Sequence, residues 1–363
     1  MATPRPWWKQ ALQIVITLAV LVLVFGFFIP QLADYRTVLD VIQDISTGEW
    51  LILFALAGWF LIAYVFVLMA AVRGLHFREG FVAQTTATAI TNTIPAGGAF
   101  AVPLQYAMYL SWGFTPEAVT AALLAAGVFD QLARLALPTL SVLVVALTGD
   151  AETWMWLAAV IGVVIVVGAV VLLGLLFSSE NAAQKIGAVL DRLMARVMRL
   201  FGRSKIDMVA AVLQFRANVI DIMRHRWVRL LVMTVLNHAA MASLFLASIR
   251  AVGISSDEVS TAWVIMSFSL GRLLVMIPVS PGGLGVVDVG FISLLSLGWA
   301  TGAANHDLIA AGVLLFRALT LIPPIPIGVG TWLAWRFGKK RRHDWQTVRR
   351  GEWRQVGDSD ARV

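Results

Sequence analysis

Cysteine is absent from this sequence, and its absence excludes a disulfide framework, a thiolate metal site and a cysteine nucleophile. Histidine is also scarce, and the five copies are scattered along the chain without a metal-binding motif around any of them. Charged residues make up only 13% of the chain, compared with about a quarter of a typical soluble domain. The sequence therefore predicts no metal site and no cofactor, and it does not resemble that of a soluble protein.

Hydrophobic residues, by contrast, make up 59% of the chain, and the mean hydropathy is +0.82. Crossing a bilayer takes about 20 apolar residues, and the runs that can do so are 11–29, 50–72, 116–147, 153–177, 230–249 and 307–335. The first run lacks a small-residue cleavage site and is predicted to be a retained anchor rather than a signal peptide. A kink is expected at Pro138 in the third run. The pattern predicts an all-α polytopic membrane protein.

Two other apolar regions are interrupted and cannot form continuous helices. The stretch I-P-V-S-P-G-G-L-G-V-V-D at 277–288 combines helix-breaking prolines with Gly282, Gly283 and Gly285, which favour positive φ. A shorter break, P-A-G-G at 95–98, contains Gly97 and Gly98. The helical arms on either side are too short for comfortable spans. We therefore expect two broken, re-entrant hairpins beside six full spans, or ten crossings if every arm spans.

The two breaks belong to an internal repeat. Shifting the chain by 185 residues aligns 94–138 with 279–323 without a gap, and 14 of the 45 aligned positions are identical. Each unit, about 50–147 and 230–336, consists of a span, a broken hairpin and a long span. The first unit enters the membrane from the side opposite to the second, so the units are predicted to have inverted topology. Transporters with such repeats move substrates by alternating access.

The positive charge of the chain is unevenly distributed. Ten lysines and arginines fall within 180–229, where their spacing among apolar residues predicts amphipathic helices on a membrane face. A basic tail occupies 338–363. The positive-inside rule places these segments and both termini in the cytoplasm, with 1–337 as one transmembrane domain. This sidedness explains the high basicity without a nucleic-acid partner. The basic segment either fixes the topology or recognises a lipid or protein.

Five charged residues lie within predicted membrane helices: Asp130, Arg134, Arg272, Asp288 and Arg317. A charge at bilayer depth costs about 2.5 to 3.5 kcal/mol and persists when it is paired, hydrated or functional. Asp130 and Arg134 share a helix face and form either a self-satisfied pair or part of a transport site. Asp288 is expected to face a cavity and to pair with Arg272 and Arg317. The net positive charge favours an anionic group such as a lipid phosphate, although the arginines could instead only hold the hairpins in place.

Polar residues elsewhere in the membrane leave two alternatives open. His238 is interpreted as an interhelical hydrogen-bonding residue rather than a proton relay. The threonine-rich arm at 81–93 either lines a cavity or packs helices together. The Gly-Gly-x-Gly pattern at 282–285 follows no strand and precedes no Gly-Lys-Ser/Thr, so it does not predict nucleotide binding.

The motifs P-A-G-G-A at 95–99 and S-P-G-G-L-G-V-V-D at 280–288, each followed by a long helix, resemble the lysylphosphatidylglycerol synthase transmembrane-region family over residues 11–337. That family usually has a glutamate where this chain has Asp288. Its first long helix commonly carries a Glu-Arg pair and a following Asp, whereas this chain has Asp130-Gln131 and Arg134. The resemblance implies a lipid translocase of the bacterial cytoplasmic membrane. Nothing after Arg336 is expected to fold into the soluble aminoacyltransferase domain of the full-length relatives.

The favoured hypothesis is thus a flippase-like protein, not an enzyme, that moves an anionic or aminoacyl-modified phospholipid between leaflets. The predicted substrate-binding residues are Asp130, Arg134, Arg272, Asp288, Arg317, Gly97, Gly98, Gly282, Gly283 and Gly285. One alternative is a membrane-embedded transferase in which Asp288 acts as a base. Another is a non-catalytic partner that docks a soluble synthase through 180–229. The chain could also form a homo-oligomer.

Overall fold

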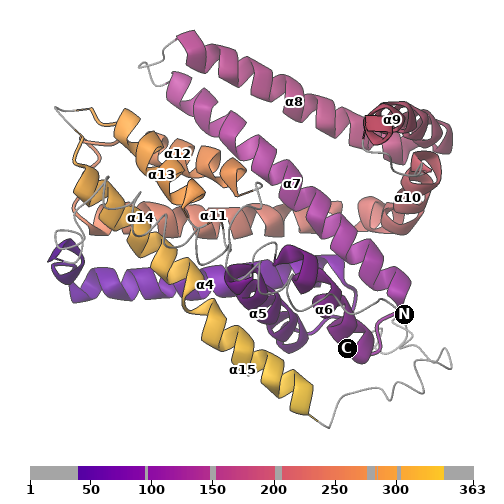
Figure 1. The fold of residues 1–363 in the computed structure, drawn as a ribbon, viewed down its shortest axis with the longest axis horizontal. Helices are drawn as coiled ribbons and strands as arrows, with labels where there is room; N and C mark the ends of the chain where they lie inside the picture. Colours follow the sequence, from indigo (N-terminus) through magenta and orange to yellow (C-terminus); the bar gives the residue numbers. More distant parts are fainter. Residues whose placement is uncertain are drawn as a thin grey trace.

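The computed structural model describes residues 40–94, 97–147, 153–200, 207–275, 283, 285–300 and 304–338. All regular secondary structure in these ranges is helical and is labelled α4 to α15 (Figure 1). Five stretches of the described chain are long and apolar enough to cross a membrane: Thr47–Ala71, Pro116–Leu147, Met155–Ser178, Trp227–Ala251 and His306–Phe337. These agree with five of the six predicted spans and confirm a multi-pass membrane protein. The sixth, 11–29, lies outside the described residues, as does most of the basic tail.

The first repeat unit contains four helices, α4 (Thr47–Ala71), α5 (Phe77–Thr93), α6 (Gly98–Ser111) and α7 (Pro116–Leu147). Helix α4 starts with a capping box, in which the Ser46 side chain accepts a hydrogen bond from the backbone of Glu49 and the Glu49 carboxylate accepts one from the backbone of Ser46. Helix α7 begins at Pro116, where a missing N–H costs nothing. It continues through Pro138 to Leu147 as one helix.

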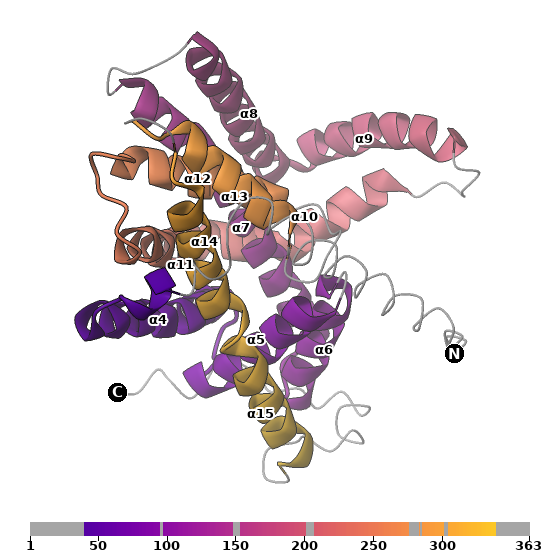
Figure 2. The ribbon, with the colours of Figure 1, turned by 60° about the vertical axis from the view of Figure 1, so that its left-hand side comes forward.

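Three helices connect the units, α8 (Thr153–Ser178), α9 (Glu180–Leu200) and α10 (Met208–His225). Many valines and leucines of α8 are exposed, as expected for a helix that contacts lipid on most of its surface. Helices α9 and α10 pack against each other, and α10 also packs against α7, whereas α9 extends away from the bundle (Figure 2). The prediction of helices in the basic segment is confirmed.

The second unit contains α11 (Trp227–Ala251), α12 (Thr261–Leu274), α13 (Val286–Leu297), α14 (His306–Leu321) and α15 (Pro324–Phe337). The predicted last span, 307–335, is present as one apolar stretch, His306–Phe337, but a turn at Ile322 and Pro323 divides it into α14 and α15. Consecutive prolines at 323 and 324 remove two neighbouring backbone donors, whereas α7 has the single Pro138 at the matching place.

The first helices of the two units lie side by side and run in opposite directions. At one end, an Arg226 side-chain nitrogen donates to the carbonyl oxygen of Ala70 at 3.3 Å. At the other end, Leu53 of α4 and Ile249 of α11 share one hydrophobic core. Figure 1 shows the same antiparallel pair, with α4 and α11 crossing the molecule next to each other.

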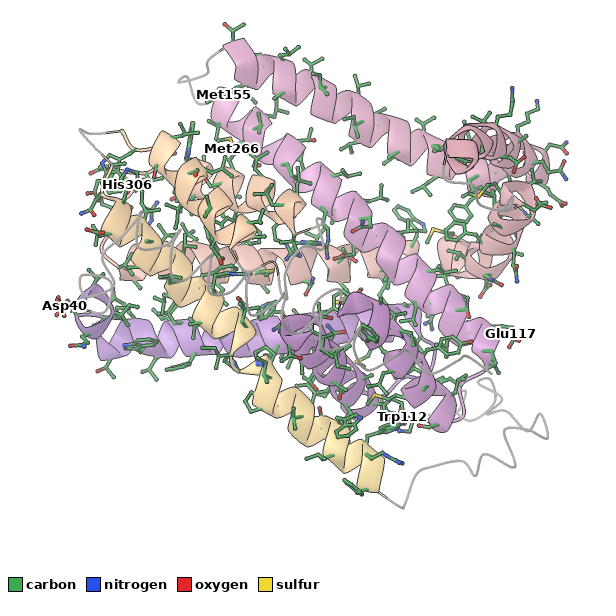
Figure 3. The ribbon with its side chains drawn as sticks, in the orientation of Figure 1. Asp40, Trp112, Glu117, Met155, Met266 and His306 are labelled. Atoms are coloured by element: carbon green, nitrogen blue, oxygen red, sulfur yellow. The ribbon has the colours of Figure 1, made fainter. Side chains whose placement is uncertain are left out.

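Each hairpin packs its first arm against the long helical stretch of the other unit. Helix α5 lies against α15, with the hydroxyls of Thr85 and Thr331 2.9 Å apart. Helix α12 lies against α7, where Met266 packs on Val142 and Val145 and is joined by Met155 of α8 (Figure 3). The shift of 185 residues relates α5 to α12 and α15 to the end of α7. The two contacts are therefore equivalent under the repeat.

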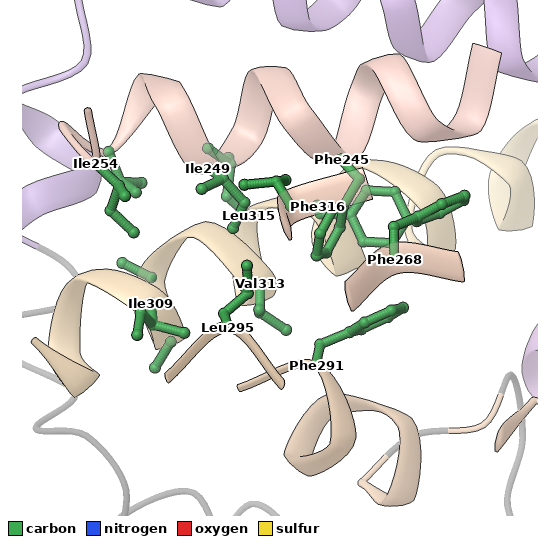
Figure 4. Packing of buried hydrophobic residues seen from close by; sticks show 14 of the residues in the cluster. Phe245, Ile249, Ile254, Phe268, Phe291, Leu295, Ile309, Val313, Leu315 and Phe316 are labelled. Carbon is green, nitrogen blue, oxygen red and sulfur yellow. The ribbon is translucent and has the colours of Figure 1, made fainter. Parts of the chain in front are cut away.

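Four phenylalanines form the centre of the largest hydrophobic core, which joins α11, α12, α13 and α14 (Figure 4). The ring of Phe245 lies 4.9 Å from that of Phe291 and 5.0 Å from that of Phe316, in an edge-to-face arrangement with the latter. Phe268 stacks with Phe291. Aromatic pairs of this kind add about 0.5 to 1.5 kcal/mol beyond their buried area. This core holds the second hairpin against the helices that carry the charged residues described next.

Candidate functional site

The break in the second hairpin places opposite charges at facing helix ends. Arg272 lies in the last turn of α12, and Asp288 lies in the first turn of α13. Each charge complements its helix macrodipole, since cations are stabilised at C-termini and anions at N-termini. Gly283 and Gly285 have φ values of 73° and 91°, as predicted for positive-φ glycines. Gly282 lies outside the described residues.

Asp288 is completely buried and bonded through both carboxylate oxygens. Oδ1 lies 2.6 Å from Nε of Arg317 on α14, and Oδ2 accepts a hydrogen bond of 2.8 Å from the backbone N–H of Gly285. The relative exposure is 0% for the Asp288 side chain and 8% for that of Arg317. The expectation that Asp288 faces an open cavity is therefore wrong. The carboxylate instead caps its own helix and holds α13 against α14.

A second ion pair lies within α7, and His238 of α11 contacts its carboxylate from the other unit. Arg134 contacts Oδ2 of Asp130 with Nε at 2.8 Å and with a terminal nitrogen at 2.7 Å. Nε2 of His238, a residue only 2% exposed, lies 3.2 Å from Oδ1 of the same carboxylate. The expectation that Asp130 and Arg134 meet on one helix face is confirmed. His238 contacts a residue of another helix, as expected, but neither of its ring nitrogens makes a hydrogen bond within the described part of the chain. His238 joins the charged residues because α11 packs against α7, which sequence spacing alone does not reveal.

Arg272 lies near both ion pairs. It interacts electrostatically with Asp130, Arg134 and Arg317. Its Nε atom is buried and has no hydrogen-bond partner within the described part of the chain. The expectation that Arg272 shares Asp288 with Arg317 is wrong, because among the described residues the ion pair of this carboxylate is with Arg317. We refer to these residues together as the central cluster: Asp130, Arg134, His238, Arg272, Asp288 and Arg317.

Tyr64 was not identified from the sequence as part of this region. Its side chain on α4 interacts electrostatically with Asp130 and Arg134. A tyrosine within an apolar span carries no distinguishing spacing, so only the packing of α4 beside α7 brings it to the cluster. Members of the central cluster thus come from α7, α11, α12, α13 and α14, and α4 closes one side. No group of three or more potential metal ligands occurs among the residues that the structure describes.

The glycines of the first hairpin have a different role. Gly97 has φ of −54° and precedes α6. A Cβ atom there would lie 2.5 Å from the carbonyl oxygen of Ile90 and 2.8 Å from that of Ile94. Gly97 therefore allows α6 to start directly against the end of α5. A Cβ atom on Gly98 would meet no atom within 4 Å, so this glycine is not required by close packing.

Two cavities lie away from the central cluster. One of about 310 Å³ lies between α5, α6 and α15, and Thr86 and Thr93 are among its lining residues. Other threonines of α5 bond to helices, as Thr85 does to Thr331, so the threonine-rich arm both lines a cavity and packs helices. A second cavity of about 420 Å³ lies between α7, α8 and α10 and includes Gln131. Neither is lined by a member of the cluster.

A family model described as the lysylphosphatidylglycerol synthase TM region matches residues 10–328. The chain belongs to this family. The match contains both repeat units up to the start of α15, and it therefore contains every member of the central cluster. No curated protein matches the chain.

Membership of the lysylphosphatidylglycerol synthase TM region family relates this chain to lipid modification or translocation. The matched region and the five candidate spans describe the same membrane domain. In this member of the family, the buried charges do not lie at random in the spans. They converge where the helices of both units meet.

Proposed function

We propose that the chain is a flippase-like lipid translocase, rather than an enzyme, that moves an anionic or aminoacyl-modified phospholipid between the leaflets of the bacterial cytoplasmic membrane. The observation that carries this proposal is the convergence of three arginines and two aspartates from both repeat units inside one membrane domain. Such charges are expensive in a bilayer and occur where substrates or ions pass. A phospholipid headgroup is the polar cargo to which the family membership points.

The arrangement of the helices supports a transport cycle. The antiparallel α4 and α11, and the equivalent α5/α15 and α12/α7 contacts, fit an inverted repeat with both termini in the cytoplasm. The arms α5, α6, α12 and α13 have 17, 14, 14 and 12 residues, less than the roughly 20 residues of a span. We therefore propose two re-entrant hairpins beside six spans.

In this proposal the described structure is a closed state. The aspartates and Arg317 are enclosed, and neither cavity reaches them. Loosening the α5/α15 contact or the α12/α7 contact would open the cluster towards one side of the membrane at a time. The equivalence of the two contacts under the repeat makes the two openings similar motions, as alternating access requires.

The test is exchange of lipids between leaflets in proteoliposomes. The purified chain is reconstituted with phospholipids that carry a fluorophore on an acyl chain, and bleaching of the outer leaflet measures how fast the inner pool appears outside. We expect exchange above that of protein-free vesicles. Arg272→Gln should slow it by about tenfold or more, because a charge-assisted hydrogen bond to the cargo is lost.

The matched control is Arg216→Gln. Arg216 lies on α10 and bonds the carbonyl oxygen of Leu176 at 3.1 Å, away from the cluster. This variant should exchange lipids at the wild-type rate. If no lipid of any charge exchanges faster than in empty vesicles, the translocase proposal fails. The transferase and synthase-partner hypotheses would then be favoured.

A further inference from the structure

The central cluster has no free anionic group for a positively charged ligand. Asp130 uses Oδ2 for Arg134 and Oδ1 for His238, and Asp288 uses Oδ1 for Arg317 and Oδ2 for the N–H of Gly285. The charge of each aspartate is already balanced by an arginine, so a cationic amine would find no uncompensated negative charge in the cluster unless it displaced one of these arginines. Breaking a buried ion pair in this way is costly because it leaves a buried charge without compensation.

Among the described residues, no carboxylate outside the cluster is placed to bind a cationic amine there. Outside the cluster, the acidic side chains of the described ranges lie near the starts of helices, in connecting segments or on the amphipathic helices α9 and α10. Glu79, the most buried of them, lies in the first turn of α5, where it accepts a hydrogen bond from the backbone of His76. The polar centre of the membrane domain is therefore poor in acceptors for a cation.

Positive charge is in excess at the same place. With three arginines and two aspartates, the cluster has one arginine more than it has carboxylates. Arg272 is the arginine without a carboxylate partner in the described chain, and Arg134 and Arg317 surround it with like charge. A guanidinium presents planar donors that match the two free oxygens of a phosphodiester. One such group would balance the additional arginine.

We propose that Arg272 binds the phosphodiester of a lipid with a net negative headgroup, and that the site discriminates against headgroups bearing an added amine. The preferred cargo is then an unmodified anionic phospholipid such as phosphatidylglycerol, rather than its lysyl ester. This inference rests on the proposed translocase function and selects between the two classes of lipid that the function leaves open. The physical cause is repulsion, because an aminoacyl ammonium group adds positive charge next to three arginines in a medium of low dielectric constant.

The test uses the exchange assay with three acyl-labelled lipids of different headgroup charge. Phosphatidylglycerol carries one negative charge, phosphatidylethanolamine is neutral overall, and lysylphosphatidylglycerol carries one positive charge. We expect exchange rates to fall in that order, with phosphatidylglycerol at least about tenfold faster than lysylphosphatidylglycerol. Equal rates, or faster exchange of the lysyl lipid, would overturn the inference while leaving the translocase function intact. Absence of exchange for all three would instead reject the function.

Variants of Arg272 distinguish a residue that binds the lipid from a residue that only stabilises the fold. Arg272→Lys keeps the charge and should retain the order of the three lipids. Arg272→Gln should slow the exchange of phosphatidylglycerol about tenfold and the exchange of the neutral lipid much less, so that the preference for the anionic lipid is lost. A uniform loss for all lipids in both variants, at unchanged thermal stability, would assign Arg272 a structural role and contradict the inference.

A soluble anion could bind to the same guanidinium group of Arg272. Inorganic phosphate is therefore added in excess to the wild-type proteoliposomes. Unchanged exchange of phosphatidylglycerol supports a site reached by the lipid headgroup. Inhibition by phosphate that abolishes exchange would assign the site to a water-soluble anion and overturn the lipid assignment.

Discussion

The α12–α13 hairpin carries Arg272 and Asp288 at its break, whereas the α5–α6 hairpin has Ala87 and Pro103 at the positions 185 residues earlier. The second hairpin extends its break through glycines with positive φ, while the first starts α6 already at Gly98. The two hairpins therefore occupy matching positions of the repeat but differ in chemistry. The first contributes close packing, and the second contributes charge.

In the long helices, unlike the hairpins, the first unit carries more of the charged residues than the second. Asp130 and Arg134 of α7 correspond to Leu315 and Leu319 of α14, and Arg317 corresponds to Leu132. None of the five charged residues has a charged counterpart in the other unit, yet all five meet in one cluster. A repeat can thus keep its pseudo-symmetric packing while its polar site becomes asymmetric.

The equivalent interhelical contacts differ in the same way. In the α5/α15 contact, Thr85 and Thr331 bond to each other, and their counterparts in the α12/α7 contact are Leu270 and Ala146. Gly328 lets α15 approach the backbone of α5 closely, and its counterpart in α7 is Leu143. The first contact depends on small and polar residues, whereas the second depends on apolar side chains.

The largest expected effect tests the charge difference between the hairpins. Asp288→Asn should lower the free energy of unfolding by about 3 to 5 kcal/mol, because Arg317 loses the counter-charge of a buried pair. Adding Arg317→Gln should recover part of that loss. The measurement is denaturant-induced unfolding in detergent, followed by circular dichroism.

The control for this pair lies at the same repeat position of the first hairpin. Pro103→Ala leaves no charge unpaired and should cost less than about 1 kcal/mol. A cost for Asp288→Asn as small as that for Pro103→Ala would mean that the Asp288–Arg317 pair does not hold the second hairpin in place.

A smaller effect is expected from breaking the close contact of the first hairpin. A Cβ atom on Gly328 would overlap the backbone oxygen of Thr85 and lie 2.5 Å from Cβ of Ala89. Gly328→Ala should lower the free energy of unfolding by about 1 to 3 kcal/mol through overpacking. Gly330→Ala, on the same helix with no atom within 4 Å, should stay within about 1 kcal/mol of wild type. Equal effects from the two alanines would contradict a tight α5/α15 contact.

The smallest effect compares matched glycines of the two breaks. Gly283 has φ of 73°, and its Cβ would lie 2.7 Å from Cγ2 of Val287, whereas the equivalent Gly98 has open space. Gly283→Ala should cost about 1 to 2 kcal/mol for the left-handed backbone, and Gly98→Ala should be neutral or slightly stabilising. Thermal unfolding of both variants in detergent measures the difference. A cost at Gly98 equal to that at Gly283 would show that the breaks have the same backbone requirement.

Much of the fold could be predicted from the sequence because a membrane helix is recognised from the hydrophobicity of its own residues. Continuous apolar runs indicated five spans that the structure contains, and proline and glycine indicated where both hairpins break. The interruption at Ile322 was missed, although the paired Pro323 and Pro324 were its signal. The five charged residues of the candidate site were visible as exceptions within apolar helices.

The sequence by itself thus determined that this chain has membrane-spanning segments and that two parts of it are related by an internal repeat. It also determined which residues within the apolar helices carry charge. Hydrophobicity and repeat similarity are properties of the chain read in order, so no tertiary information is needed. The tertiary structure alone decided that Arg317 rather than Arg272 pairs with Asp288, and that His238 and Tyr64 approach Asp130. Ion pairing depends on distances of a few ångströms between side chains of different helices, and helix packing sets those distances.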